Sequence, residues 1–442
     1  MECKVFKFGG ASIKDVEGFI NVGKIIKHFE KENLVIVISA LGKTTNALEE
    51  VVKTWFYQKP GAKDLLMNVK NSHQQIAAAL LKDSSSVFNE INDLIVEIEW
   101  IIEESPQEKF DYYYDQIVSI GEMLSTKILA YYLTELGLPA VWVDARDIIQ
   151  TDNTYRDARI DWDHTQKKAD HILKKFLEQQ KMVITQGFIG CSSENFTTTL
   201  GREGSDYTAA VLSYCLDAGS MHIWKDVPGV LTADPRLFQN VIKLPRLSYK
   251  EAIEMTYYGA KVIHPKTIKP LQNKNIPLYV RPFDDSESEG TLISDVLELS
   301  YPPVIVIEPN QCLLHIASND FSFVAEHHLS RIFSLLDKHR IKVNMMRNTA
   351  ISFTICTSYI PDKIEAFRVE LGKEFNMVID DELELVTIRH YNEETLQNMK
   401  KNRLVLLEER LRNTIQMVIK NLPEMKRIEG SKKKAGSNYG LN

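Results

Sequence analysis

The chain has 442 residues, of which 44% are hydrophobic and 26% charged, and its formal net charge is −7 at pH 7. This length suffices for two or more domains that each bury a core, which excludes small disulfide-dependent scaffolds, and the composition excludes a disordered or collagen-like chain. The mild acidity leaves no basic face for a phosphate backbone, so we expect no nucleic-acid partner. The one basic cluster, at residues 432–434, lies near the C-terminal end.

The five cysteines lie far apart and form no CxxC pair, which favours neither a disulfide framework nor a zinc site. The first ten residues lack the apolar segment of a signal peptide, and no apolar run approaches the about 20 residues that span a bilayer. We therefore expect a cytoplasmic protein with no membrane partner.

The first 40 residues predict a strand, a glycine turn, a helix and a second strand. Residues 4–8 form a β-like run that stops at Gly9 and Gly10, a helical pattern follows, and residues 34–40 are nearly all apolar. A continuous apolar strand is typical of a parallel sheet covered on both faces. The pattern therefore predicts an α/β domain with a mainly parallel sheet between helices.

Helical spacing then continues over a long stretch. Residues 62–104 predict a helical hairpin broken at the polar residues 83–86, and one further helix carries Ile117 and Leu124 on one face. Strands are predicted next at residues 140–143, 182–186, 221–224 and 278–281. Pro302 and Pro303 indicate a linker, so we place a domain boundary near residue 300.

Beyond residue 300 the predicted order becomes βαββαβ, the ferredoxin-like arrangement. The predicted strands are residues 312–317, 342–347, 350–357 and 383–389, with helices around residues 329–336 and 364–375. A helix at residues 393–402 and strands at 404–407 and 413–420 predict a partial repeat. This second region covers residues 301–425, and residues 426–442 are expected to form a disordered basic tail.

Two segments combine glycines, hydroxyls and charge at the start of a helix. In KFGGAS, residues 7–12, backbone N–H groups beside two glycines are suited to phosphate oxygens and Lys7 adds a charge, although a plain turn stays open. In residues 197–210, Arg202 suits a carboxylate and the helix is expected to begin near Thr208. The alternative there is a simple cap by Ser205 or Asp206.

Two further segments contain turn formers or a lysine beside a glycine, and the first of them follows a predicted strand. Residues 224–236 contain Pro228 and Gly229, which by themselves indicate only a type II turn. Residues 258–265 place Lys261 near Gly259, and taken singly such a lysine is most often solvated.

Together these segments resemble the aspartate kinase family, within the amino-acid kinase superfamily. The motifs KFGG, SAxxxxTN, GE, TxGRxGSD, W-D-PGVxTADPR and GAKVxHP follow one another within residues 4–268. The region after residue 300 is similar to the ACT regulatory modules of that family. The resemblance implies an amino-acid kinase domain over residues 1–300, an ACT-like regulatory region over 301–425, and a homodimer formed through that region.

The resemblance also implies the reaction. ATP, with Mg²⁺, would phosphorylate the side-chain carboxylate of L-aspartate to give 4-phospho-L-aspartate, the first step of lysine, threonine and methionine synthesis. Lys7 and Lys261 would neutralise phosphate charge and Asp206 would orient Lys7 and the metal, while no residue is expected to be a protein metal ligand. The implied substrate-binding residues are Ser39, Thr45, Glu122, Arg202 and Ser205. The implied nucleotide-binding residues are Gly9, Gly10, Ser12, Asp226, Asp234 and Arg236.

The chain departs from the family pattern at Ala11, Glu203 and Lys225. For Lys225 two positions stay open, a contact with nucleotide phosphate or the protein surface. In the ACT-like region, Asn344 stands where lysine-binding relatives have an aspartate, so we expect no inhibition by lysine in the usual manner.

Two other functions stay open. A superfamily kinase for glutamate, acetylglutamate or a nucleoside monophosphate is disfavoured by Glu122 together with Arg202, which suit a free α-amino acid. An inactive ACT-containing amino-acid sensor is disfavoured by the intact Lys7 and Asp206.

Overall fold

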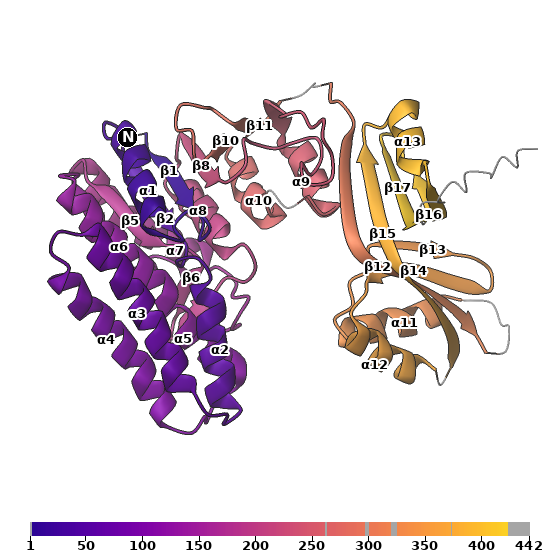
Figure 1. Ribbon diagram of the computed structural model, residues 1–442, viewed down its shortest axis with the longest axis horizontal. Coiled ribbons are helices and arrows are strands. Elements are labelled where there is room, and N and C mark those ends of the chain that lie inside the picture. The colour runs from indigo at the N-terminus through magenta and orange to yellow at the C-terminus, as the bar shows by residue number, and fades with distance from the viewer. Residues whose placement is uncertain (1, 261–262, 297–299, 320–324, 373, 423–442) are drawn as a thin grey trace, which may run out of the picture. The chain divides into compact units, whose positions relative to one another are not determined.

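The computed structural model describes residues 2–260, 263–296, 300–319, 325–372 and 374–422 (Figure 1). The chain separates into two compact units, Met1–Ser300 and Tyr301–Asn442. Lys261 and the expected tail at residues 426–442 lie outside the described residues. Within the described residues, none of the helices combines the length and the apolar character needed to cross a membrane.

The first unit alternates strands and helices for most of its length. Its strands are β1 Lys4–Phe8, β2 Leu34–Ile38, β3 Ala140–Trp142, β4 Gln150–Thr151, β5 Met182–Gln186, β6 Ile189–Ser192, β7 Thr197–Thr199, β8 Ser220–Lys225, β9 Arg246–Ser248, β10 Leu278–Pro282 and β11 Thr291–Ser294. Its helices are α1 Val16–His28, α2 Thr44–Phe56, α3 Ala62–Leu80, α4 Ser85–Glu103, α5 Phe110–Val118, α6 Ile120–Glu135, α7 Trp162–Glu178, α8 Gly204–Cys215, α9 Tyr249–Tyr257 and α10 Pro265–Asn273, with a 3-10 turn at Ala145–Asp147.

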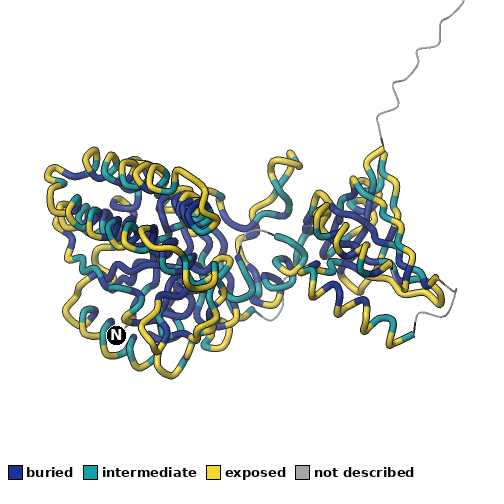
Figure 2. The backbone as a smooth tube through the Cα atoms, turned by 90° about the horizontal axis from the view of Figure 1, so that it is seen from below, coloured by how far each residue is buried: buried dark blue, intermediate teal, exposed yellow. Residues whose placement is uncertain are grey.

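An eight-stranded sheet in the order β3-β5-β2-β1-β8-β10-β11-β9 forms the centre of this unit. β10 and β11 pair antiparallel and the other neighbours pair parallel, which confirms the mainly parallel sheet between helices. All residues of β2 and β5 are buried, as a strand covered on both faces requires (Figure 2).

Alternation along β1 separates the hydrophobic core from the polar site. Phe6 and Phe8 pack into the large apolar cluster that includes Phe19 of α1 and Leu124 of α6. Because successive side chains on a strand point to opposite faces, Lys7 points to the other face, where α8 packs against β1 and β8. The strand therefore anchors a charged side chain with two large buried neighbours.

The helices differ from the sequence predictions in two places. The hairpin predicted at residues 62–104 is confirmed by α3 and α4, whereas the single helix predicted through Ile117 and Leu124 is two helices, α5 and α6, divided at Ser119. The prediction that α8 begins near Thr208 is also wrong, because α8 begins at Gly204 and its N-cap residue is Glu203. Ser205 and Asp206 lie inside its first turn and cap nothing.

The second unit is a six-stranded antiparallel sheet in the order β13-β14-β12-β15-β17-β16, with α11 and α12 packed against each other. Its strands are β12 Val304–Ser318, β13 Met345–Asn348, β14 Ser352–Ser358, β15 Phe375–Arg389, β16 Arg403–Arg410 and β17 Thr414–Asn421. Its helices are α11 Glu326–Lys338, α12 Pro361–Leu371 and α13 Glu393–Lys400.

The βαββαβ order is present, but two strands are longer than predicted. β12 and β15 each have 15 residues and pair along their whole length, with the register shifted between Glu308 and Gln311. Helix α12 ends at Leu371 rather than at Phe375, which is the first residue of β15. The two central strands therefore run through both halves of the sheet.

Candidate active site

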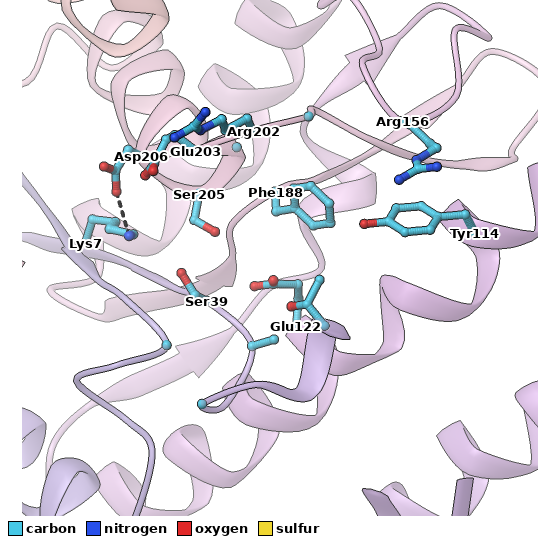
Figure 3. A pocket seen from close by; sticks show the side chains of 16 residues that line it. Lys7, Ser39, Tyr114, Glu122, Arg156, Phe188, Arg202, Glu203, Ser205 and Asp206 are labelled. Carbon is cyan, nitrogen blue, oxygen red and sulfur yellow. Dashed lines mark ion pairs between the residues drawn. The ribbon is translucent and has the colours of Figure 1, made fainter. Parts of the chain in front are cut away.

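A cavity of about 450 Å³ lies in the first unit, beside the carboxyl ends of β1 and β2 and the first turn of α8 (Figure 3). Its lining combines three cationic and three acidic side chains with hydroxyls and glycines. The lining residues are Lys7, Gly10, Ser39, Ala40, Gly42, Thr45, Tyr114, Glu122, Arg156, Phe188, Gly201, Arg202, Glu203, Gly204, Ser205 and Asp206. Strand ends of a parallel sheet are the usual position of ligand sites in open α/β folds.

The glycine turn after β1 packs tightly against the loop after β2. A Cβ on Gly10 would lie 2.6 Å from the carbonyl oxygen of Ala40, so a larger residue would force the two loops apart. The N–H of Gly42 donates to the carbonyl of Gly10 at 3.1 Å. This contact sets the positions of Lys7 and Ser39 relative to each other.

The first turn of α8 begins with a constrained backbone. Glu203 has a φ of 56°, in the left-handed region, and a Cβ on Gly204 would lie 2.6 Å from the Phe188 ring. Glycine at position 204 thus permits the close approach of α8 to the residues after β5. The start of the helix at this point directs Ser205 and Asp206 toward the end of β1.

Asp206 is fully buried and lies between two lysines. Its carboxylate oxygens are 2.6 Å from Nζ of Lys7 and 3.4 Å from Nζ of Lys225. Burial by itself would raise the pKa of Asp206, but the charges of the two lysines outweigh this effect and hold the pKa below its usual value. Asp206 is therefore a carboxylate that positions two ammonium groups.

Glu122 lies in the first turn of α6 and is 3% exposed. Burial raises its pKa to about 8, an effect that the N–H of Ala40 and the charge of Lys7 reduce only in part. Its Oε2 atom is buried and has no hydrogen-bond partner among the described residues. A buried acceptor of this kind, directed at a cavity, is suited to a cationic ligand group.

The other predicted substrate-binding residues also line the cavity. Ser39 and Thr45 come from the loop after β2 and the start of α2, and Arg202 and Ser205 come from the segment that leads into α8. Figure 3 shows the hydroxyls of Ser39 and Ser205 directed toward each other across the cavity. A guanidinium and a buried carboxyl group thus share one cavity, which suits a ligand that carries both charges.

Three lining residues lie outside every sequence motif, namely Tyr114, Arg156 and Phe188. Five others stand within the motifs but had no predicted role, namely Ala40, Gly42, Gly201, Glu203 and Gly204. The guanidinium carbon of Arg156 lies 4.1 Å from the centre of the Tyr114 ring, and its Nη2 atom lies 3.6 Å from Oε1 of Glu49. Arg156 has a φ of 69°, an uncommon conformation for a side chain of this size. No motif marks Tyr114, Arg156 or Phe188, and only the fold brings them to the cavity.

Asp115 is buried and holds the backbone of Arg156, one of the residues that line the cavity. Its carboxylate accepts hydrogen bonds from the N–H of Thr199 at 2.8 Å, from Oγ1 of Thr199 at 2.7 Å and from the N–H of Arg156 at 3.1 Å. Burial raises the pKa of Asp115 to about 6, although these hydrogen bonds lower it in part. Asp115 thereby joins α5 to β7 and to the backbone that carries Arg156.

The predicted nucleotide-binding residues other than Gly10 do not line this cavity. Gly9 and Ser12 belong to the turn after β1, where the N–H of Ser12 donates to the carbonyl of Gly9 at 3.0 Å. Asp226 is exposed, and Asp234 pairs with the exposed Arg236 at 2.6 Å. Lys261 lies outside the described residues.

The model of the amino acid kinase family matches residues 2–282. The chain belongs to the amino acid kinase family. Among relatives of this kinase it is 32% identical to lysine-sensitive aspartokinase 3 of Escherichia coli over 357 residues, which are 80% of this chain and 78% of the relative. It is also 30% identical to the chloroplastic aspartokinase 1 of Arabidopsis thaliana, over 87% of this chain and 68% of the relative. These relatives place it among the aspartokinases.

Solved structures of aspartokinases share the architecture of this kinase. The crystal structure of E. coli aspartokinase III in complex with aspartate and ADP has a TM-score of 0.80 and 27% identity, and the match covers 95% of this chain and 96% of that one. The Clostridium acetobutylicum aspartate kinase, 22% identical with a TM-score of 0.76, shows the same fold. The sequence resemblance to aspartate kinases and the expected fold are thereby confirmed.

Proposed function

We propose that the cavity holds L-aspartate for phosphorylation by ATP, in the reaction of the aspartokinases. The protein transfers the γ-phosphoryl group of ATP to the side-chain carboxylate of L-aspartate and forms 4-phospho-L-aspartate, the first step in the synthesis of lysine, threonine and methionine. One observation carries this proposal: Glu122, Arg202 and the Lys7 and Asp206 pair line a single cavity of about 450 Å³.

Glu122 and Arg202 select a free α-amino acid. The carboxylate of Glu122 accepts the α-ammonium group, and the guanidinium of Arg202 binds the α-carboxylate, for which its paired donors are suited. Ser39, Thr45 and Ser205 supply hydroxyls along the same wall. The side-chain carboxylate of aspartate is then left to face the phosphate side of the cavity, where Lys7 lies.

Lys7 and Asp206 serve the transfer itself. The attacking carboxylate is ionised at pH 7, so it needs no general base, and the barrier is lowered chiefly by positioning and by neutralisation of phosphate charge. Lys7 supplies that charge, and Asp206 fixes its direction through the 2.6 Å ion pair. Lys261 adds a second positive charge on the nucleotide side in this proposal.

The nucleotide is bound by the turn after β1 and by the segment after β8. The N–H groups of Gly9 and Gly10 and the hydroxyl of Ser12 contact phosphate oxygens, since such turns direct N–H groups at an anion. The proposed remaining contacts on the nucleotide side are Asp226, Asp234 and Arg236.

Magnesium fits this site as a partner of the nucleotide. No group of three or more His, Cys, Asp or Glu side chains suited to a metal exists within the part of the chain that the structure describes. Both oxygens of Asp206 already face ammonium groups, so phosphate oxygens and water would supply the oxygen ligands that Mg²⁺ prefers. When bound, the ion neutralises charge on the transferring phosphate.

The proposal is tested by ATP-dependent release of ADP with L-aspartate, L-glutamate, N-acetylglutamate or UMP as acceptor, with hydroxylamine to trap the acyl phosphate. We expect turnover with L-aspartate and hydroxamate formation. Saturable binding of amino acids without turnover for any acceptor would reject the kinase and favour the amino-acid sensor.

We further propose a cytoplasmic homodimer that associates through the second unit. The edge strand β16 carries the exposed side chains Leu404 and Leu406, and all five cysteines are free, as a reducing compartment requires. Light scattering on the full chain is expected to give twice the mass of one chain. Leu404→Glu together with Leu406→Glu is expected to give a monomer.

A further inference from the structure

Lys225 lies on the same face of the large sheet as Lys7. β1 and β8 pair parallel, with Lys7 opposite Ile223, and Lys225 follows Ile223 by two residues at the end of β8. Since side chains two positions apart on a strand share a face, both lysines point toward the first turn of α8. The backbone of Lys225 is held there, because its carbonyl accepts a hydrogen bond from the N–H of Phe283 at 2.7 Å.

Lys7 and Lys225 share the carboxylate of Asp206 but differ in their distance from it and in their exposure to solvent. Lys7 lies 2.6 Å from Asp206 and its side chain is 9% exposed, whereas Lys225 lies 3.4 Å away and is 20% exposed. Both ammonium groups thus lie beside one buried carboxylate, in surroundings where water is largely excluded and charge is therefore felt more strongly. In the proposed function Glu122 and Arg202 match the α-ammonium and α-carboxylate groups of the substrate and Lys7 faces its side-chain carboxylate, so Lys225 has no assigned contact with the amino acid.

Lys225 faces a different region from Lys7. Lys7 and Asp206 both line the cavity described above, whereas Lys225 is not among its lining residues and contacts Asp206 through the other carboxylate oxygen. Lys225 also leads directly into the exposed Asp226, at the start of the segment assigned to the nucleotide. Its ammonium group is therefore placed on the nucleotide side of Asp206.

We propose that Lys225 binds the phosphates of the nucleotide, with Asp206 as the group that holds Lys7 toward the acceptor and Lys225 toward the donor. This inference rests on the proposed function and adds to it, besides Lys7 and Lys261, a lysine at a position where the aspartate kinase pattern has none. Lysine is a compact point charge on a flexible stem, and it is well suited to phosphate oxygens whose charge grows as the bond to the γ-phosphoryl group breaks.

The test is the affinity for ADP and for AMP, measured by calorimetry without aspartate on wild type and on Lys225→Ala, Lys225→Thr and Lys225→Arg. The matched control is Lys274→Ala, because Lys274 also pairs with an aspartate, Asp217 at 2.5 Å, and is 27% exposed. We expect Lys225→Ala and Lys225→Thr to bind ADP roughly 10- to 100-fold more weakly, as for the loss of a hydrogen bond to a charged group. AMP binding should change little, and Lys225→Arg should recover much of the loss.

A merely structural role for Lys225 predicts different results. Equal weakening of ADP and AMP, or no recovery in Lys225→Arg, would indicate a disturbed Asp206 and overturn the proposal, as would ADP affinity within about twofold of the Lys274→Ala control. Kinetics give a second readout, in which KM for ATP rises and KM for aspartate stays unchanged. If wild type shows no turnover with aspartate but the Lys225 variants still lose ADP affinity selectively, the proposed function fails and the phosphate-binding role stands.

Discussion

If Glu122 binds the α-ammonium group as proposed, its buried carboxyl group is expected to make aspartate binding depend on pH in the physiological range. Burial raises its pKa to about 8, so at pH 7 only about one-tenth of the ligand-free protein carries the carboxylate that an α-ammonium group needs. Binding must then release a proton, which weakens the affinity at pH 7 by about 1.4 kcal/mol relative to the fully ionised site. Below the pKa, the affinity for aspartate is expected to fall about tenfold for each pH unit.

Calorimetry of aspartate binding between about pH 6.5 and 8.5 measures this slope, and buffers of different ionisation enthalpy report the protons released, close to one per site at pH 7. The lower limit keeps the measurement above the pKa of Asp115, which is raised to about 6 by burial. Glu122→Gln is the control, because it keeps the shape and removes the titration. An affinity that is constant over this range in wild type, or a slope that survives in Glu122→Gln, would refute the reasoning.

The raised pKa of Glu122 also makes the stability of the folded protein depend on pH. The pKa of Glu122 is raised in the folded protein above the ordinary value of 4.5, so its contribution to stability is complete below about pH 4.5 and is lost as the pH rises through about 8. Between pH 7 and 9 this loss is about 1.4 kcal/mol. In urea unfolding, Glu122→Gln is expected to lose less stability over that interval than wild type.

The remaining predictions concern the rest of the site. Lys7→Ala is expected to lower kcat by about 100-fold or more with thermal unfolding near that of wild type, and near-normal turnover would reject its role. Arg202→Ala is expected to raise KM for aspartate by roughly 10- to 100-fold with a smaller effect on kcat, as steady-state kinetics would show. Asp115→Asn replaces one acceptor by a donor opposite the N–H and hydroxyl of Thr199, and should cost about 1–3 kcal/mol in urea unfolding. Millimolar L-lysine is expected to leave the rate unchanged, because the amide of Asn344 donates to Gln311 at 2.9 Å and offers no carboxylate to an ammonium group.

Much of the kinase unit was predictable because its strands are short, apolar and bounded by glycine or polar turns. The prediction for β1 was correct to the residue, and the hairpin of α3 and α4 followed from helical spacing. The start of α8 was not predictable from local preference. Gly204 and Ser205 are poor helix formers, and the helix begins there because Gly204 packs against Phe188, a contact between segments 16 residues apart.

The lengths of the central strands of the second unit were missed for a similar reason. Pro309 usually ends a strand, but here it lies in the irregular stretch between Glu308 and Gln311, and β12 continues beyond it. In β15, three acidic residues at 380–382 interrupt the apolar pattern, and the strand passes through them with Glu382 at a φ of 57°. Pairing between distant segments, which a local pattern does not contain, decided both lengths.

In the site, too, some residues could be predicted from the local sequence and others could not. The charged residues that line the cavity from β1, α6 and α8 stand in motifs, so their types and spacing could be recognised before the fold was known. Tyr114 and Arg156 stand in no pattern, and their approach to the cavity depends on how α5 and the segment after β4 fold over it. Their contribution was accessible only from the structure.

The long pairing of β12 with β15 also bears on how the second unit folds. Val304 pairs with Arg389 at one end of the two strands, and Ser318 pairs with Phe375 at the other. The chain must therefore close loops of about 60 to 85 residues before β12 and β15 can pair. Contacts so distant in sequence slow folding. The strands on either side of the central pair, β13 and β14 on one side and β17 and β16 on the other, depend on β12 and β15 for their pairing partner. Amide protons of β14 and β17, on opposite sides of the central pair, are therefore expected to exchange through one common opening event, so that the six strands form a single cooperative unit.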